Sequence, residues 1–187
     1  MRRPAAPGAL LRPPGFLILW SMGGDPSMAK SDMFLKVEGA RSGTIKGESE
    51  DAERKGEIDV VSWSWGMHAQ TEMGGGGSLA KASMREFLIS KRVDSASTPL
   101  MAALRNNDLI KKATLTVRKA GKAPLDYYIV VMEQGRITSL DVESVGEEHP
   151  ELVERLSFSF QKISIEYVPQ GPDGLGMGSM LFEAETI

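Results

Sequence analysis

The sequence predicts a mainly β protein, an antiparallel β-barrel of two packed sheets with one short α-helix. Three observations lead to this fold class. Apolar and polar residues alternate along several short segments, helical spacing of apolar residues occurs in one segment only, and glycine and proline mark turns between segments. Many short strands with a single helix are typical of a barrel or sandwich that a helix closes at one end.

The alternation is clearest in two segments that we expect to be half-buried strands. In the first, Leu35 and Val37 alternate with charged residues; in the second, Ala113, Leu115 and Val117 alternate with polar ones. Successive side chains of a strand point to opposite faces, so this period places one face of each strand in the core.

Two longer segments change phase midway. In residues 57–66 the apolar side chains lie first at Ile58 and Val60 and then one position later, from Val61 onward. A β-bulge at Val60–Val61 would produce this slip. We expect a similar bulged strand over 156–167, and long strands that bend at bulges suit a barrel.

Residues 127–132 are apolar on both faces, which predicts a central strand or one covered by a helix or another subunit. Residues 137–145 follow Gly135, and we expect them to form its hairpin partner. The helix is predicted over 99–107, with Thr98 as N-cap and Pro99 at the first helical position. Its apolar face comprises Leu100, Ala103 and Leu104.

We divide the chain into an extension at 1–27, a barrel domain at 28–168 and a C-terminal tail at 169–187 with a glycine-rich turn. The extension is rich in proline and has an apolar run at 16–20, which is shorter than the core of a signal peptide or a membrane-spanning helix. We interpret it as disordered or as an artefact of an upstream start. We expect no cleaved signal peptide and no membrane insertion.

Composition excludes several classes of protein. The 187 residues include 22 Lys and Arg, 25 Asp and Glu, two His and no Cys, which gives a formal charge of −3. Without cysteine there is no disulfide scaffold, thiolate zinc site or cysteine nucleophile, and two histidines cannot form a multi-histidine metal site. No basic cluster is present to bind phosphate backbones, so we expect no nucleic acid partner.

No pattern of residues predicts an enzyme, a cofactor site or a metal site. The glycine run at 74–77 lacks the Gly-Lys-Ser/Thr that a phosphate-binding loop needs, and we interpret it as a flexible connection. His68 and His149 are predicted to be surface or rim residues, because no nucleophile pattern accompanies either.

A charged segment and a set of apolar residues are the candidate functional residues. We expect the segment to be a solvated, mobile polar loop; it comprises Glu48, Ser49, Glu50, Asp51, Glu53, Arg54 and Lys55. The apolar set is assigned to the core or to a subunit interface, and comprises Trp63, Trp65, Tyr127, Ile129 and Val131.

The order of several motifs resembles the haemolysin-coregulated protein (Hcp) family of the type VI secretion system. DMFLKV at 32–37 resembles the family's opening strand, IKGES at 45–49 the start of its extended loop, and EIDVVSWSWG at 57–66 its most recognisable stretch. The glycine run, the approach to the helix at 94–101, TLTVRKAG at 114–121 and the segment 158–170 follow in the same order. Residues 1–27 have no counterpart, and the segments 40–44 and 147–155 depart from the family pattern.

This resemblance implies a tube subunit. Such subunits close into homohexameric rings that stack into a hollow tube, are assembled in the bacterial cytoplasm, and are exported with the help of sheath, baseplate and spike components. The resemblance also implies that effector proteins are carried or chaperoned in the lumen. It makes the polar loop at 48–55 the candidate contact with an adjacent ring.

Two other functions are compatible with the residues. One is a monomeric carbohydrate- or ligand-binding β-barrel that uses Trp63 and Trp65 as a stacking platform. The other is a hydrolase that uses the carboxylates between Glu48 and Glu53, but catalysis requires carboxylates that are held rigidly and have pKa values that are pushed apart.

Overall fold

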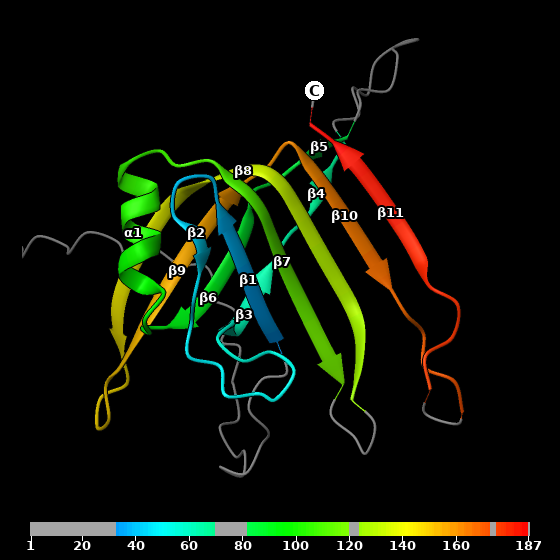
Figure 1. Cartoon of the computed structure of the whole chain (residues 1–187), viewed down its shortest axis with the longest axis horizontal. Coiled ribbons are helices and arrows are strands. Elements are labelled where there is room, and N and C mark those ends of the chain that lie inside the picture. The colour runs from blue at the N-terminus through cyan, green and yellow to red at the C-terminus, as the bar shows by residue number, and fades with distance from the viewer. Residues whose placement is uncertain (1–32, 70–81, 120–123, 173–174, 187) are drawn as a thin grey trace, which may run out of the picture.

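The computed structural model describes residues 33–69, 82–119, 124–172 and 175–186. In this part of the chain there are eleven strands and one short helix (Figure 1). The predicted extension at 1–27 and the glycine run at 74–77 lie outside the described residues.

Six antiparallel strands close into a barrel, which confirms the predicted fold class. Around the barrel the order is β8-β7-β1-β3-β6-β9, and β9 pairs with β8 to complete the circle. The strands are β1 (Met33–Gly39), β3 (Ile58–Ser64), β6 (Phe87–Arg92), β7 (Ile110–Lys119), β8 (Leu125–Val145) and β9 (Glu151–Ser159).

Closure depends on a bend in β8, which spans 21 residues. Its first half pairs with β7 and its second half with β9. At the bend Gln134 has a φ of 52°, and a Cβ on Gly135 would lie 2.2 Å from the carbonyl oxygen of Ser159. The predicted hairpin after Gly135 is therefore wrong: this glycine permits a close approach to β9 within one continuous strand, and the chain does not reverse there.

The predicted bulge at Val60–Val61 is confirmed, because the register between β3 and β6 shifts between Val60 and Ser62. The bulged strand predicted over 156–167 is wrong. The chain turns at Phe160 and Gln161, and two separate strands result, β9 and β10 (Lys162–Tyr167). The Gln161 N–H donates to the carbonyl oxygen of Glu133, which directs β10 along the first half of β8.

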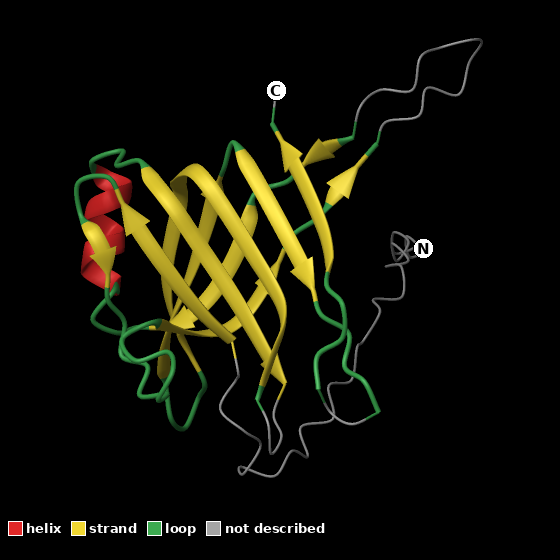
Figure 2. Ribbon diagram, turned by 45° about the vertical axis from the view of Figure 1, so that its right-hand side comes forward, coloured by secondary structure: helices red, strands yellow, loops and turns green. Residues whose placement is uncertain are grey.

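The remaining strands lie outside the barrel. β10 extends the sheet beyond β8, and β11 (Met180–Glu185) pairs with β10 inside the segment that we expected to be a tail. β2 (Gly43–Ile45) pairs with β1, and β4 (Met67–His68) pairs with β5 (Ser83–Met84). Figure 2 shows the helix on one side of the barrel and the β10–β11 extension on the opposite side.

Helix α1 (Ser97–Arg105) begins earlier than predicted. Ala96 is the N-cap and Pro99 is the third helical residue, so the assignment of Thr98 as N-cap is wrong. The reason lies upstream: the Asp94 carboxylate accepts the Ala96 N–H at 2.9 Å, and the Ser97 hydroxyl accepts the Asp94 N–H at 3.0 Å. These side chains satisfy backbone groups at the turn and start the helix before Thr98.

One hydrophobic core fills the barrel and continues under α1. Three strands contribute Leu35, Leu115 and Phe158 to this core, and the helix contributes Leu100. All four side chains are fully buried. Burial of each such side chain contributes roughly 1.5–3 kcal/mol, so the short helix is stabilised mainly by this contact.

Candidate assembly surfaces

The predicted inter-ring residues lie in the loop between β2 and β3, which we call the β2–β3 loop (residues 46–57). Its two limbs are hydrogen-bonded to each other: the Gly47 N–H donates to Gly56 at 2.9 Å and the Ser49 N–H donates to Glu57 at 3.0 Å. A Cβ on Gly47 would lie 2.5 Å from the Glu57 carbonyl oxygen, so the limbs approach closely only because this residue is glycine. Ser49 is buried. The two limbs of the loop are therefore held against each other, which the sequence analysis did not predict, while most of its charged side chains are exposed to solvent.

The loop is fastened to the approach of α1 by its first residues. Glu48 accepts the Ser95 N–H at 3.0 Å, and the Ser95 hydroxyl donates to the Lys46 carbonyl oxygen at 3.2 Å. Ser95 lies two residues before the helix, so the loop and the start of α1 share these contacts.

Arg118 on β7 fastens the middle of the loop. Its guanidinium contacts Asp51 at 3.1 Å, Glu53 at 2.9 Å and Asp126 at 3.0 Å. Arg54 also pairs with Asp126. We call these five side chains the Arg118 network; the Arg118 side chain is only 6% exposed, whereas that of Glu53 is 68% exposed. The network joins two loop carboxylates to the end of the β7–β8 pair.

The network shifts several pKa values. Burial acts to lower the pKa of Arg118, but hydrogen bonds to Asp126 and Asp51 outweigh it and raise the pKa. The pKa of Asp51 is lowered, first by the N–H of Glu53 and also by Arg118. Burial raises the pKa of Glu57, and Arg54 opposes that shift. Asp51 is thus held as a carboxylate that binds Arg118, which does not suit a general acid.

We expect the Asp51 contacts to be lost in acid. A carboxyl whose folded pKa is lowered stabilises the folded loop above its unfolded pKa, about 3.9, and this stabilisation disappears as the pH falls through the folded value. The amide proton shifts of Glu53 and Arg54, followed by NMR, should titrate with a midpoint below that of an ordinary Asp. Asp51→Asn should abolish the transition, and a midpoint above about 4 would contradict the assignment.

Exposure divides the predicted loop residues into two groups. Asp51 and Arg54 are half-buried and, with the buried Ser49, hold the loop in place. The exposed residues, which are available to another molecule, are Glu48, Glu50, Glu53 and Lys55.

The predicted apolar set divides into residues that pack on the core and residues that do not. The Trp63 ring stacks on Phe87 and on Tyr128, each with a centroid distance of 5.5 Å. Trp65 is tilted against Phe160, and its indole N–H donates to the Arg85 carbonyl oxygen at 3.1 Å. Both tryptophans are half-buried and contact the core, so their rings are engaged within the chain.

The other three residues lie on β8. Tyr127 packs against the core cluster and carries the Lys119 ammonium 5.1 Å from its ring centre. Ile129 and Val131 are half-buried, lie in the middle of the sheet between β7 and β10, and are not part of the core cluster. This confirms that 127–132 is a central strand segment.

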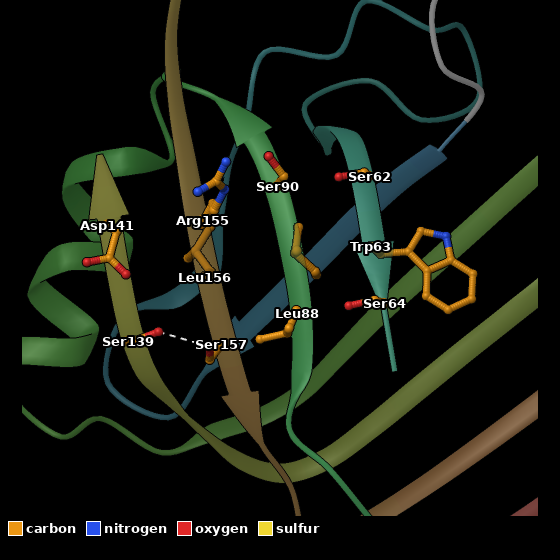
Figure 3. Close-up of a pocket in the computed structure, with 11 residues that line it drawn as sticks. Ser62, Trp63, Ser64, Leu88, Ser90, Ser139, Asp141, Arg155, Leu156 and Ser157 are labelled. Carbon is orange, nitrogen blue, oxygen red and sulfur yellow. Dashed lines mark hydrogen bonds between the residues drawn. The ribbon is translucent and has the colours of Figure 1, made fainter. Parts of the chain in front are cut away.

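A surface groove that the sequence analysis did not identify lies across β3, β6, β9 and the second half of β8 (Figure 3). Its volume is about 380 Å³. Leu88 is 47% exposed in it, and Ser139 and Ser157 are joined by a hydrogen bond of 2.8 Å. The signal in the sequence is serine at outward positions of several strands, and the serines that line the groove are Ser62, Ser64, Ser90, Ser139 and Ser157.

The groove and the nearby strands hold few groups for catalysis. Asp141 is the one carboxylate among the groove residues, and Arg155 lies beside it on β9. On β4 and β5, His68 Nε2 lies 3.2 Å from the Ser83 hydroxyl, but both are exposed and no carboxylate within the described ranges hydrogen-bonds to the imidazole. Within the described residues, no three or more His, Asp or Glu side chains are grouped so that they could hold a metal ion. None of the helical segments within the same ranges has the length and apolarity to cross a bilayer.

Comparison with known proteins places these features in one family. The family model described as "Type VI secretion system effector, Hcp" matches residues 34–167. The protein hcp1 of Pseudomonas aeruginosa is 34% identical over 146 residues, which cover 76% of this chain and 86% of that protein. The crystal structure of a type VI secretion system effector from Yersinia pestis is 30% identical, with a TM-score of 0.65, and covers 83% of this chain and all of that one.

A further solved structure, titled as that of a type six secretion system protein, is similar in fold. It has a TM-score of 0.72 at 22% identity, and the match covers 80% of this chain and 91% of the other. The family match spans the barrel from β1 to β10, including the β2–β3 loop and the groove. The chain belongs to the Hcp family of type VI secretion system proteins.

Proposed function

We propose that this chain is the structural subunit of a type VI secretion tube. Six copies close into a ring, rings stack into a hollow tube, and the tube is exported with effector proteins in its lumen. The sheath, baseplate and spike of the same system are its partners. Subunits are assembled in the cytoplasm and leave the cell without cleavage of a signal peptide.

The observation that carries this proposal is the family match over 34–167, which includes every barrel strand apart from the first residue of β1. The chemistry of the described side chains supports it. Asp51 and Glu53 of the β2–β3 loop are engaged in ion pairs with Arg118, and no described nucleophile is joined to a complete set of catalytic partners. A tube subunit needs stable surfaces and no enzyme activity.

The β2–β3 loop supports the stacking of rings. The Arg118 network fixes its middle and Ser95 fixes its beginning, while Glu50 and Lys55 remain exposed. A fixed loop loses little conformational entropy when it contacts another ring, so such a contact forms at low cost. Its charged character makes the contact sensitive to salt.

We therefore expect stacking to be weaker than ring closure. At about 1 M salt the Debye length falls to about 3 Å, so contacts between exposed loop charges are screened while apolar ring contacts persist. Sedimentation velocity should show single rings at high salt and a small stacked fraction at low salt. Long tubes that form spontaneously at micromolar concentration and survive high salt would contradict this order of strengths.

The serine-lined groove supports the carriage of effectors. Hydroxyl groups donate and accept hydrogen bonds, and exposed Leu88 adds a small apolar contact, so the groove suits a protein surface that is held weakly and later released. We expect Leu88→Arg to reduce the amount of co-purified effector about tenfold, with the ring intact. Val61→Arg is the matched control, because Val61 is equally exposed on β3 but does not line the groove. Equal losses in both variants would contradict the role of the groove.

The structure gives less support to a monomeric carbohydrate-binding barrel. Such a protein needs an aromatic face that is open to the sugar. Trp63 stacks on two aromatic rings of its own chain, and Trp65 is held by Phe160 and Arg85.

Negative-stain imaging of the purified full chain tests the proposed function. Ring-shaped particles with a central hole are the expected result. Compact particles without a hole at every concentration would favour the monomeric barrel and would contradict the tube subunit.

A further inference from the structure

The strand register arranges the residues of the serine-lined groove in two rows across β3, β6, β9 and β8. Paired residues of an antiparallel sheet share a face, so each row runs from strand to strand along the outer surface. The first row consists of Ser62, Ser90, Arg155 and Asp141. The second row consists of Ser64, Leu88, Ser157 and Ser139. Charged side chains therefore line the groove only at the β9–β8 end of the first row.

The positive charge of the groove is already engaged. Two nitrogens of the Arg155 guanidinium contact the two carboxylate oxygens of Glu143, at 2.6 Å and 3.3 Å. Glu143 lies on β8 and does not line the groove. A contact of two nitrogens with two oxygens is the favoured geometry for arginine and carboxylate. An anionic group that enters the groove would have to break this pair before it could bind Arg155.

The negative charge of the groove is available. Asp141 is exposed, and among the described residues no lysine, arginine or histidine pairs with its carboxylate. Arg155 lies opposite Asp141 in the register, but Figure 3 shows the two side chains pointing apart. A cationic group can therefore bind Asp141 without displacing a partner of its own chain.

Neighbouring hydroxyl groups add acceptors beside this carboxylate. Ser139 lies two residues before Asp141 on the same face of β8, and its hydroxyl is joined to that of Ser157 at 2.8 Å. Each hydroxyl oxygen has two lone pairs, and this bond uses only one of the four, so acceptors remain free. A lysine ammonium has three donors and an arginine guanidinium has five, so either cation can bind the carboxylate and a hydroxyl together.

The exposed apolar residue of the groove lies at a fixed distance from Asp141. Leu88 is two strands away from it across the sheet and two residues away along it. Strand and residue spacings place the two positions about 12 Å apart. In an extended peptide, residues two positions apart are on the same side and about 7 Å apart, and a lysine stem covers the remaining distance.

We propose that the groove holds an extended segment of an effector protein that carries a lysine or arginine, and that Asp141 selects this segment by binding its cation. Leu88 then contacts an apolar residue two positions away in the segment. This inference rests on the proposed carriage of effectors and names the class of segment that the groove takes. Six grooves in one ring would present six such carboxylates, so weak contacts with one effector would add.

Titration of the purified full chain with three probe peptides, followed by ligand-observed NMR, measures the preference. Each peptide is blocked at both ends and has the sequence Gly-Ser-Leu-Ser-Xaa-Ser-Gly, in which Xaa is lysine, glutamine or glutamate. We expect the lysine peptide to bind about fivefold more tightly than the glutamine peptide, which is the upper range for an exposed ion pair. The glutamate peptide should bind no more tightly than the glutamine peptide, because Arg155 stays with Glu143.

Two matched variants locate the preference. Asp141→Asn keeps the size of the side chain, removes its charge and should abolish the preference for lysine. Glu86→Gln is the control, because Glu86 is also exposed and has no cation partner in the described part of the chain, but does not line the groove. It should keep the full preference. Both positions are exposed, so both variants should retain the mass of the wild-type ring.

Each other outcome would contradict a stated part of the inference. Equal losses in Asp141→Asn and Glu86→Gln would show a preference set by general surface charge and would overturn the assignment to Asp141. A wild-type preference for the glutamate peptide would overturn the cationic class. Rings that bind none of the three peptides would overturn the groove as the site and leave the tube subunit standing. A monomeric chain that still prefers the lysine peptide would contradict the tube and support the contact with Asp141.

Discussion

Lys91→Met should destabilise the chain by about 3–5 kcal/mol, the typical cost of leaving a buried charge without its partner. Lys91 is fully buried on β6. Its ammonium lies 2.7 Å from Glu154, 2.8 Å from Asp94 and 3.1 Å from the Ser97 hydroxyl. The substitution leaves a fully buried Glu154 carboxylate with no cation, and Glu154 Oε1 already lacks a hydrogen-bond partner within the described ranges.

The matched control is the double variant Lys91→Met, Glu154→Leu. Apolar replacement of both members of a buried pair is often neutral or stabilising, so we expect the double variant to recover most of the loss. Urea unfolding measures the difference, at one protein concentration for all variants because an oligomer's stability depends on concentration. A double variant as unstable as the single one would contradict the role of the pair. The pair joins β6, β9 and the start of α1.

Arg118→Gln should release the middle of the β2–β3 loop and cost about 1.5–3 kcal/mol, the range for hydrogen bonds to charged groups, since its partners are partly exposed. It removes the cation that Asp51, Glu53 and Asp126 share. We expect the variant to form rings with the wild-type mass but to lose their stacking at low salt. Sedimentation velocity measures both properties, and urea unfolding gives the stability.

Two further variants test whether the effect of Arg118→Gln comes from the loss of its loop contacts and not from the loss of a positive charge alone. Lys119→Gln removes the neighbouring cation, which contacts Tyr127 and not the loop, and should cost about 0.5–1 kcal/mol with stacking unchanged. Arg118→Lys keeps the charge but loses the planar guanidinium that contacts two loop carboxylates. Its stability and its stacked fraction should lie between those of the wild type and of Arg118→Gln. Wild-type stacking in Arg118→Gln would show that the loop does not need this anchor.

Local pattern was sufficient to predict most of the barrel. The period-two alternation at Leu35 and Leu115 identified β1 and β7, and the phase slip at Val60–Val61 identified a bulge. Patterns of this kind reflect which face of a strand is buried, and that information is contained in a few neighbouring residues.

The errors arose where one local signal has two structural uses. Gly135 was interpreted as a turn, yet it allows β8 to approach Ser159 as the strand bends. Thr98 and Pro99 have the residue types of a helix start, but Asp94 and Ser97 supply the side-chain hydrogen bonds earlier. β11 was missed because its alternation of Met180, Phe182 and Ala184 follows a glycine-rich segment and pairs only with β10.

The contacts that hold the candidate loop could not be predicted from the sequence. The charged residues of the β2–β3 loop were named from the sequence, and their role between rings stays a prediction. The anchor of the loop, Arg118, lies 67 residues after Asp51, and no local pattern connects them. The five serines of the groove come from four strands, so only the assembled sheet brings them together.

Native mass spectrometry of the full chain at micromolar concentration tests the central claim most directly. The account predicts a dominant species of six times the 20.3 kDa chain, present without added partners. A dominant 20.3 kDa species at every concentration would contradict the closed ring, and with it the assignment of the chain as a tube subunit.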